Sequence, residues 1–438
     1  MLQTTNYVKI LEEKIDIKSA RIGIIGLGYV GLPTSLHFAK RGYFVTGFDL
    51  SNIKVKKINE GISYIQDVDT EELSAFVKKG YIKATTNMEE LQNMDILFIC
   101  VPTPINDYKE PDLSYVQRAS QMVAAHIKCG TLVILESTTF PGTTEEYVVP
   151  PLQKKGWVVG QDLFVAYSPE RVDPGNKQYS LENTPKVVGG VTKHCSHLAA
   201  KIIGQTAHVV SDVRIAEMCK IFENSFRWIN MAFVNEIACL CETLDINIWE
   251  MIDASATKPY GFMKFTPGMG VGGHCIPVDP YYLTYRAKKY GEHTKMINLA
   301  GELNGKMKKV TYDRIIDLLL KHKKLPILSN IVILGVSYKE NVDDVRESPV
   351  VPVLEKLMRT VKNVHIMDPY VKTCQLNGET EIVFAYDISM IQKADLVVIA
   401  TPHDDFPYQE IVKYASLVLD VKNICGKQNI RSKHIYTL

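Results

Sequence analysis

Residues 21–31, with the sequence RIGIIGLGYVG, decide the fold of this chain. An apolar run over Arg21–Gly26 predicts a buried β-strand, and a helical pattern begins behind it. The glycines fit the spacing GxGxxG, in which the first allows a tight turn, the second lets the backbone approach a pyrophosphate and the third lets the helix pack closely. The helix N-terminus offers N–H groups to phosphates. The predicted dinucleotide-binding loop consists of Gly26, Gly28, Tyr29, Val30 and Gly31.

An acidic residue follows the next predicted strand. The strand covers Phe44–Phe48 and ends at Asp49, which lies 23 residues after Gly26. A carboxylate at this place accepts hydrogen bonds from ribose hydroxyls and repels a 2′-phosphate. No arginine follows directly, since Leu50 and Ser51 come next. This predicts NAD rather than NADP as the cofactor. The alternative is a glycine-rich turn followed by a solvated aspartate.

Three further apolar runs alternate with helix-length segments, which indicates βαβ units and a parallel sheet. Each run ends in a polar cluster, and ligands bind at the carboxyl edge of such a sheet. The predicted strands are Ile96–Val101, Thr131–Leu135 and Leu163–Tyr167, and the residues behind them include Pro102, Thr103, Thr139 and Glu170. We therefore expect Pro102 and Thr103 to contact the cofactor.

Residues 211–244 have helical periodicity and contain no glycine or proline. Such a helix would span about 50 Å, and a helix this long in an α/β enzyme usually joins domains and often lies in a subunit interface. Near Ile331 the α/β pattern returns. IVILGVSYK, VHIMDPY and ADLVVIATPHD repeat the order of IGIIGLGYV, VTGFDLS and MDILFICVPTP. The second copy lacks the glycine triplet, so we do not expect it to bind a dinucleotide.

The predicted fold is therefore α/β, with two Rossmann-like doubly wound domains joined by a central long helix. We expect an N-terminal NAD-binding domain over residues 1–210. A central helical segment with the dimer interface follows over 211–310, and a C-terminal Rossmann-like domain over 311–438.

The composition narrows the class of protein. The chain has 438 residues and a net charge of +1, so no overall field favours nucleic acid or a membrane surface, and we expect neither as a partner. Nine scattered cysteines without a CxxC pair are typical of a reduced cytoplasmic protein. The first residues show no signal peptide, and no run approaches the length of an apolar membrane span.

The segment GVGGHCIPVDP, residues 270–280, suggests a nucleophile. Three glycines leave the backbone bare around Cys275, which suits a thiol that a substrate must approach closely. Pro277 and Pro280 prevent a helix through the motif, so a shaped loop is expected. The alternatives are an inert buried cysteine and, for Asp279, an ordinary helix N-cap. We assign His274 no proton-transfer role.

Seven motifs occur in one order: GLGYVGLP, VPTP, ESTTFPGTT, SPERVDPG, the helix with Lys220 and Asn224, GVGGHCIPVDP and LGVSYKENVDDVRESP. Together they resemble the UDP-glucose/GDP-mannose dehydrogenase family, over nearly the whole chain after about residue 20. KPYGFMKF and HCIPVDPYYL look most like the bacterial UDP-N-acetylglucosamine 6-dehydrogenases.

The resemblance implies a catalytic role for Cys275, which would attack the C6 aldehyde and carry a thioester, with two NAD used per sugar. Lys220 would stabilise the developing alkoxide, and Asn224 would orient a water or the oxyanion. The alternative for Lys220 is a charge paired with Glu217 or Glu223. Thr143 and Glu146 fit a capping box and are read as structural.

Three further catalytic residues follow from the resemblance. Glu170 would act as a base in thioester hydrolysis, although a surface pair with Arg171 is the alternative. Asp279 would position Lys220 or the water, and Thr139 would bind a catalytic water or the cofactor.

The charged segment 338–348 is expected to hold the nucleotide, with Lys339 and Arg346 on the diphosphate or sugar and Asp344 fixing Arg346. Lys258 is a match for a basic residue that reaches the partner subunit's site. The predicted substrate contacts are Glu170, Arg171, Lys220, Asn224, Lys258, Phe262, Phe265, Gly272, Lys339 and Arg346; Lys264 is a further candidate.

The resemblance implies four-electron oxidation of the C6 hydroxyl of a UDP-sugar, with UDP-N-acetylglucosamine preferred, for surface polysaccharide biosynthesis. UDP-N-acetylmannosamine, UDP-N-acetylgalactosamine and UDP-glucose stay open as substrates. Alternatives of another class are a two-electron hydroxyacid dehydrogenase and a non-catalytic nucleotide-sugar binding module. A homodimer or higher homo-oligomer is expected, and no metal, since His403-Asp404-Asp405 is read as a loop.

Overall fold

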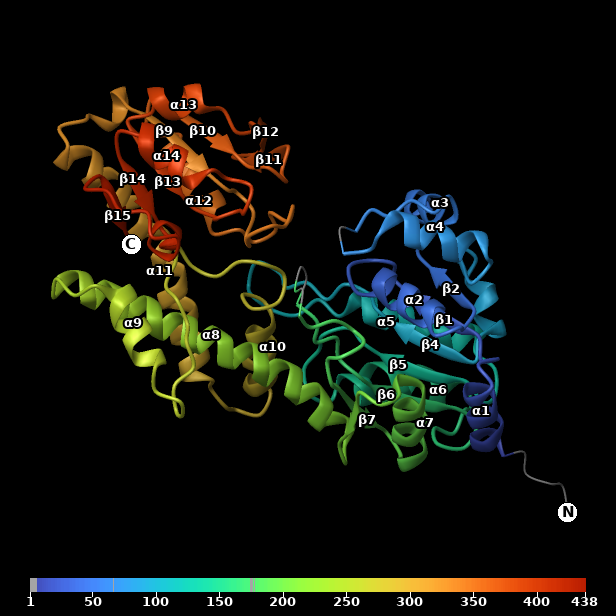
Figure 1. Cartoon of the computed structure of the whole chain (residues 1–438). Coiled ribbons are helices and arrows are strands. Elements are labelled where there is room, and N and C mark those ends of the chain that lie inside the picture. Colours follow the sequence, from blue (N-terminus) through green and yellow to red (C-terminus); the bar gives the residue numbers. More distant parts are fainter. Residues whose placement is uncertain (1–5, 66, 174–175, 177) are drawn as a thin grey trace, which may run out of the picture. The chain divides into compact units, whose positions relative to one another are not determined.

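The computed structural model describes residues 6–65, 67–173, 176 and 178–438. The last two residues of the predicted motif SPERVDPG, 174–175, lie outside the described residues. The chain forms two compact units (Figure 1). The N-terminal unit comprises Met1–Glu223 and Tyr281–Glu292, and the C-terminal unit comprises Asn224–Pro280 and His293–Leu438.

The N-terminal unit is built on an eight-stranded sheet with the order β3-β2-β1-β4-β5-β6-β7-β8. Its strands are parallel except for the antiparallel pair β6 and β7. The strands are β1 (Ile22–Ile25), β2 (Val45–Phe48), β3 (Ile82–Thr85), β4 (Ile96–Ile99), β5 (Leu132–Leu135), β6 (Phe164–Tyr167), β7 (Lys186–Gly190) and β8 (Ala207–Val209). All five strands predicted in this unit are present, within one or two residues of their predicted bounds.

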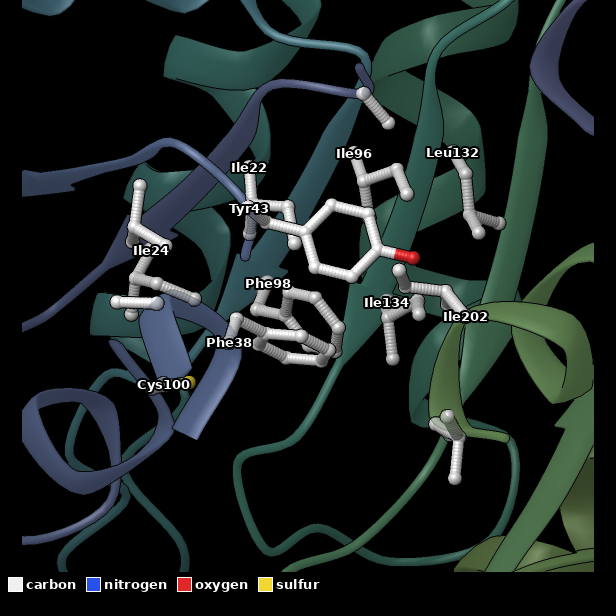
Figure 2. Close-up of a cluster of buried hydrophobic side chains, with 14 of the residues drawn as sticks. Ile22, Ile24, Phe38, Tyr43, Ile96, Phe98, Cys100, Leu132, Ile134 and Ile202 are labelled. Carbon is white, nitrogen blue, oxygen red and sulfur yellow. The ribbon is translucent and has the colours of Figure 1, made fainter. Parts of the chain in front are cut away.

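Helices cover this sheet. They are α1 (Tyr7–Asp16), α2 (Gly31–Lys40), α3 (Asn52–Asn59), α4 (Thr70–Lys78), α5 (Ser114–His126), α6 (Val149–Lys154) and α7 (Lys193–Ile203), with short helical turns η1 (Met88–Asn93) and η2 (Thr144–Val148). Figure 2 shows the core of one face, where alternate residues of β1, β4 and β5 meet the rings of Phe38 and Tyr43 and the side chain of Ile202. The Tyr43 hydroxyl donates to the carbonyl of Ile15 at 3.0 Å, so its polar end is satisfied. Burial of each such aliphatic side chain contributes about 1.5–3 kcal/mol.

The C-terminal unit contains a second parallel sheet with the order β10-β9-β13-β14-β15. This matches the order β2-β1-β4-β5-β6 of the first sheet, so the predicted second Rossmann-like domain is confirmed. Its strands are β9 (Asn330–Leu334), β10 (Asn363–Met367), β13 (Leu396–Ile399), β14 (Val418–Asp420) and β15 (Ile435–Thr437), with a separate hairpin of β11 (Thr373–Leu376) and β12 (Glu379–Ile382). Its helices are α9 (Ile248–Ala256), α11 (Lys295–Lys321), α12 (Val350–Leu357), α13 (Ile388–Lys393), α14 (Tyr408–Tyr414) and α15 (Ile424–Lys427), with the turn η3 (Pro326–Leu328).

Two helices contribute residues to both units. The first is α8 (Val213–Thr243), which has 31 residues and confirms the predicted long helix. The second is α10 (Asp279–Lys288), which follows the predicted cysteine loop. The predicted fold class, two Rossmann-like domains joined by a long helix, is therefore confirmed. Within the described residues, no helix is long and apolar enough to cross a membrane.

Candidate active site

The glycine loop of the N-terminal unit leaves room for a pyrophosphate. Gly26 has a φ of +92°, and a Cβ on Gly31 would lie 1.9 Å from the Gly26 carbonyl oxygen, so neither position accepts a side chain. A Cβ on Gly28 would meet nothing within 4 Å. Among the described residues no side chain caps α2, and the first turn of a helix has N–H groups without helical partners that can bind a phosphate. This geometry fits a bound dinucleotide.

Asp49 is anchored beside that loop at the end of β2. Its carboxylate accepts hydrogen bonds from the N–H of Leu27 and of Ser51, each at 2.9 Å. The ammonium of Lys54 lies 3.3 Å from the same carboxylate. The anchored carboxylate accepts hydrogen bonds from a ribose hydroxyl and repels a 2′-phosphate. The positive charge of Lys54 weakens the repulsion between Asp49 and a 2′-phosphate.

Behind β4, Pro102 is exposed and Thr103 is buried. The Thr103 carbonyl accepts a hydrogen bond from the Tyr282 hydroxyl of α10. Behind β5, Thr139 is completely buried, and its hydroxyl has no hydrogen-bond partner among the described residues. A buried hydroxyl without a partner is costly, so Thr139 is a strong candidate for contact with a water or ligand.

The predicted capping box of Thr143 and Glu146 is wrong. The Thr143 hydroxyl donates to the Phe140 carbonyl at 2.7 Å, and Glu146 pairs with Arg286. The N–H groups at the start of η2 instead donate hydrogen bonds to the Glu217 carboxylate of α8, from Gly142 at 2.5 Å and from Thr144 at 2.8 Å. A distant carboxylate has therefore replaced the local cap.

Lys220 lies on α8 one turn after Glu217 and is buried. Neither carboxylate proposed as its partner pairs with it, because Glu217 binds the loop after β5 and Glu223 pairs with Arg171 at 2.6 Å. In the described part of the chain Lys220 forms no ion pair. Its ammonium is thus available to a ligand.

Glu170, behind β6, does not form the surface pair with Arg171 that was the alternative. One carboxylate oxygen accepts from the N–H groups of Arg171 and Val172, both at 2.7 Å, and the other lies 3.3 Å from the ammonium of Lys186. Burial by itself would raise the pKa of Glu170, but Lys186, these N–H groups and Lys220 hold it below its usual value. Glu170 is therefore ionised at neutral pH.

In the C-terminal unit, Cys275 is exposed, which argues against the inert buried cysteine. The nine cysteines form no disulfide among the described residues. The carbonyl of Cys275 accepts from the N–H of Val278 at 3.1 Å and of Asp279 at 2.8 Å, a compact turn that leads into α10. The loop thus presents the thiol on a fixed backbone.

Segment 338–349 lies so close to Gly272 and Gly273 that neither position has room for a side chain. A Cβ on Gly272 would lie 2.7–2.8 Å from Tyr338, Glu347 and Pro349, and Gly273 has a φ of +86° and faces the Tyr338 ring. The Gly273 N–H donates to the Arg346 carbonyl at 3.3 Å. The cysteine loop and the predicted nucleotide loop are therefore packed together.

Asn224 and Asp279 meet inside the C-terminal unit. The Asn224 amide donates to Asp279 at 2.5 Å, and Arg227 donates to the Asn224 oxygen at 2.5 Å. Both Asn224 and Asp279 are buried. The chain of hydrogen bonds fixes the orientation of the amide.

The predicted substrate residues of the C-terminal unit fall into two groups. The predicted pairing of Asp344 with Arg346 is present, at 2.6 Å, and Lys339 lies half-buried in the same segment. Before the cysteine loop, Lys258 lies 4.9 Å from the centre of the Tyr260 ring, and Lys264 pairs with Asp253. Phe262 is exposed, whereas Phe265 packs against Phe226 of α8 and is better explained by packing.

The sequence predicted no role in the site for three charged residues: Glu217, Lys186 and Lys422. Lys422 follows β14 and donates to the Pro267 carbonyl at 3.3 Å. A polar residue behind a strand is the signal that could have identified Lys422, but the sequence analysis predicted no strand over Val418–Asp420. Glu217 and Lys186 offered no local signal.

Models of one family match three consecutive parts of the chain. They are the NAD-binding domain of the UDP-glucose/GDP-mannose dehydrogenase family at residues 20–206, its central domain at 214–306 and its UDP-binding domain at 332–427. The chain belongs to this family. The predicted enzyme class, an NAD-dependent dehydrogenase acting on UDP-sugars, and the predicted cofactor, NAD, are thereby confirmed.

Individual relatives are similar over almost the whole chain. A UDP-N-acetyl-D-mannosamine dehydrogenase from Pyrococcus horikoshii is 36% identical, covering 92% of this chain and 96% of the relative. A UDP-N-acetyl-D-glucosamine 6-dehydrogenase from Pseudomonas aeruginosa is 33% identical, covering 89% and 92%. A solved structure of a UDP-D-ManNAc dehydrogenase from Pyrococcus horikoshii matches with a TM-score of 0.84 at 34% identity, covering 95% of this chain and 98% of that one.

Proposed function

We propose that this enzyme oxidises the C6 hydroxyl of a UDP-linked 2-acetamido sugar to a carboxylate, in two oxidation steps with a covalent intermediate on Cys275. The observation that carries the proposal is the exposed thiol on a glycine-rich loop packed against segment 338–349. A two-electron alcohol dehydrogenase needs no nucleophile of this kind.

The reaction consists of two oxidations and one hydrolysis. The loop with Gly26, Gly28 and Gly31 would hold NAD⁺, which would supply the hydride acceptor for each of the two oxidations. The first oxidation converts the alcohol to an aldehyde and releases the hydroxyl proton. The Cys275 thiolate then forms a carbon–sulfur bond with the aldehyde carbon, and the aldehyde oxygen takes up a proton. The resulting thiohemiacetal loses a hydride and a proton to give a thioester. Water attacks the thioester, the carbon–sulfur bond breaks, and the carboxylate and the thiol are released.

The other predicted residues act on charge and water in this proposal. The buried Lys220 ammonium, which forms no ion pair within the described residues, stabilises the alkoxide. Asn224, held by Asp279 and Arg227, offers a fixed amide to the same oxygen or to water. One such donor is typically worth about 3 kcal/mol. Glu170 and the Thr139 hydroxyl orient the attacking water.

We favour UDP-N-acetylglucosamine as the substrate because of the segments around the cysteine loop. The similarity to dehydrogenases named for UDP-N-acetylmannosamine makes that sugar the second candidate. The test is the number of NADH formed per sugar over a panel of UDP-sugars, with wild type and Cys275→Ser side by side. We expect two NADH per sugar and loss of acid formation in the variant. One NADH per sugar, or an active variant, would favour the two-electron alternative.

We also propose a homodimer built through α8. In the C-terminal unit its exposed side chains Phe226, Phe233 and Leu240 recur every seven residues, so they form one apolar stripe. Phe233→Glu should produce a monomer by light scattering, while Ile382→Glu, at an equally exposed site on β12, should not. An unchanged mass for Phe233→Glu would exclude this interface. The reduced cysteines and the family support a cytoplasmic setting.

A further inference from the structure

A buried cluster of charges lies behind three neighbouring strands of the first sheet. Glu136 follows β5, Glu170 follows β6, and Lys186 is the first residue of β7. Because β7 runs antiparallel to β6, with Tyr167 opposite Gly189, the start of β7 lies at the edge where β6 ends. This reversal brings Lys186 beside the two carboxylates.

Lys186 bridges both carboxylates. Its ammonium donates to one oxygen of Glu136 and to one oxygen of Glu170, the latter at 3.3 Å. Glu136 is 2% exposed and Lys186 8% exposed, so neither charge is stable there without the other. Burial lowers the pKa of Lys186, but the charges of Glu136 and Glu170 raise it more, so the lysine is protonated.

The other side chains around Glu136 and Lys186, those of Cys100, Thr34 and His37, are uncharged. The second oxygen of Glu136 faces the Cys100 thiol at 3.2 Å and the Thr34 hydroxyl at 3.5 Å. Burial and the charge of Glu136 raise the pKa of Cys100, so it stays a thiol. Burial, Arg41 and Lys186 lower the pKa of His37 on α2 to about 4, so it is neutral.

We propose that Lys186 is a positioning residue that holds Glu170 ionised and aimed at the water of thioester hydrolysis, with Glu136 as the counter-charge that retains Lys186. The inference rests on the proposed function of Glu170. The second Glu170 oxygen is held by two backbone N–H groups, so Lys186 and Lys220 are the cations that set the charge of this side chain.

Replacing Lys186 by methionine keeps the length of the side chain and removes its charge. Glu136 and Glu170 would then face each other across a buried site and share a proton. A protonated Glu170 cannot accept a proton from water, so thioester hydrolysis should slow at neutral pH, by about 10²-fold or more. The two oxidation steps should be spared, because they depend on Cys275 and Lys220.

The experiment is stopped-flow measurement of NADH with the full-length enzyme across a range of pH. For Lys186→Met we expect an undiminished burst of two NADH per active site, followed by slow turnover that recovers as pH rises. Hydroxylamine, which displaces the thiol from a thioester without the base, should restore turnover and give a hydroxamate. Lys186→Arg should keep most of the turnover, and Lys83→Met, at an exposed ion pair on β3, should behave as wild type.

Loss of the burst together with turnover, or a pH profile identical to that of wild type, would overturn the proposal. If Lys186→Met does not fold, the double variant Lys186→Met/Glu136→Gln removes one charge of each sign. Glu170 still lacks the ammonium that offsets its burial, so turnover should again recover as pH rises, but at a lower pH than in Lys186→Met. The proposed function fails separately: wild type would then give one NADH per sugar, or Cys275→Ser would still form the acid.

Discussion

Replacing Glu217 by glutamine should remove one component of the pH dependence of stability in the N-terminal unit. Glu217 is completely buried, and its oxygens accept hydrogen bonds from Gly142 and Thr144. Burial raises its pKa from 4.5 to about 7, because these hydrogen bonds only partly offset desolvation. In the unfolded chain the carboxyl ionises first, so stability falls as pH rises through this range and is constant above it.

The size of this effect follows from the two pKa values. Between about pH 5 and about pH 8 the ionisation of Glu217 should lower the free energy of unfolding by about 2.5 kcal/mol. Glutamine cannot ionise. Its NH₂ group would face the buried N–H of Gly142 or Thr144, and this loss of an acceptor should lower the free energy of unfolding by about 1–3 kcal/mol at every pH. The stability of the variant relative to wild type should therefore improve by about 2.5 kcal/mol over this pH range.

Urea unfolding can measure this difference in the N-terminal unit. Of the three tryptophans, Trp157 lies in that unit, and Trp228 and Trp249 lie in the C-terminal unit. With both of the latter replaced by phenylalanine in each protein, fluorescence reports the unfolding around Trp157. All other titrating groups cancel in the comparison. Equal pH slopes for glutamate and glutamine at position 217 would refute the reasoning.

Three further outcomes are expected. Gly272→Ala should lower the melting temperature and turnover together, because the new Cβ would overlap three groups of segment 338–349. Gly305→Ala, in a helix with open space around the residue, should be neutral or stabilising by about 0.4–1 kcal/mol. An unchanged melting temperature and turnover for Gly272→Ala would contradict the packing argument. Asn224→Ala should reduce kcat by about 10²–10³-fold, as measured by NADH formation, since the buried Asp279 loses one hydrogen-bond donor and the substrate oxygen loses the Asn224 amide. Asp49→Asn should reduce the preference for NAD over NADP in kcat/KM by at least about tenfold, and an unchanged ratio would assign cofactor selection elsewhere.

The sequence predicted the elements that have strong local signals. Continuous apolar runs identified β1, β4, β5 and β6, and the glycine spacing identified the cofactor loop. β3 was missed because it alternates buried and exposed residues at the sheet edge, and β7 because it begins with a lysine and ends in two glycines. Neither strand contains the long apolar run by which the others were recognised.

The polar network of the site could not be predicted, because its partners meet only through the fold. Lys186 reaches Glu136, 50 residues earlier, through the antiparallel register of β7. Glu217 reaches Thr144 across 73 residues and replaces the capping box that the local spacing suggested. In both cases a carboxylate in a low-dielectric interior requires a donor, but sequence spacing does not say which one.

The two Rossmann-like sheets explain how one fold is adapted to two ligands. Gly335 repeats the tight turn of Gly26, with a φ of +84°. In the second copy, however, Asp368, at the position that corresponds to Asp49, accepts from Val336 at 2.8 Å and pairs with the buried His403 at 3.0 Å. Its carboxylate is only 3% exposed and is already occupied, so it cannot serve a ribose.

The connection after this turn differs as well. In the first sheet α2 begins at Gly31, directly behind the glycine loop, and presents its N–H groups to a pyrophosphate. In the second sheet α12 begins only at Val350, and the intervening residues 338–349 carry Lys339 and Arg346 and support the glycines before Cys275. The inserted segment offers cationic side chains in place of backbone N–H donors, which suits the diphosphate of a UDP-sugar. The same segment supports the cysteine loop, so the residues expected to bind the UDP-sugar also hold Cys275 in place.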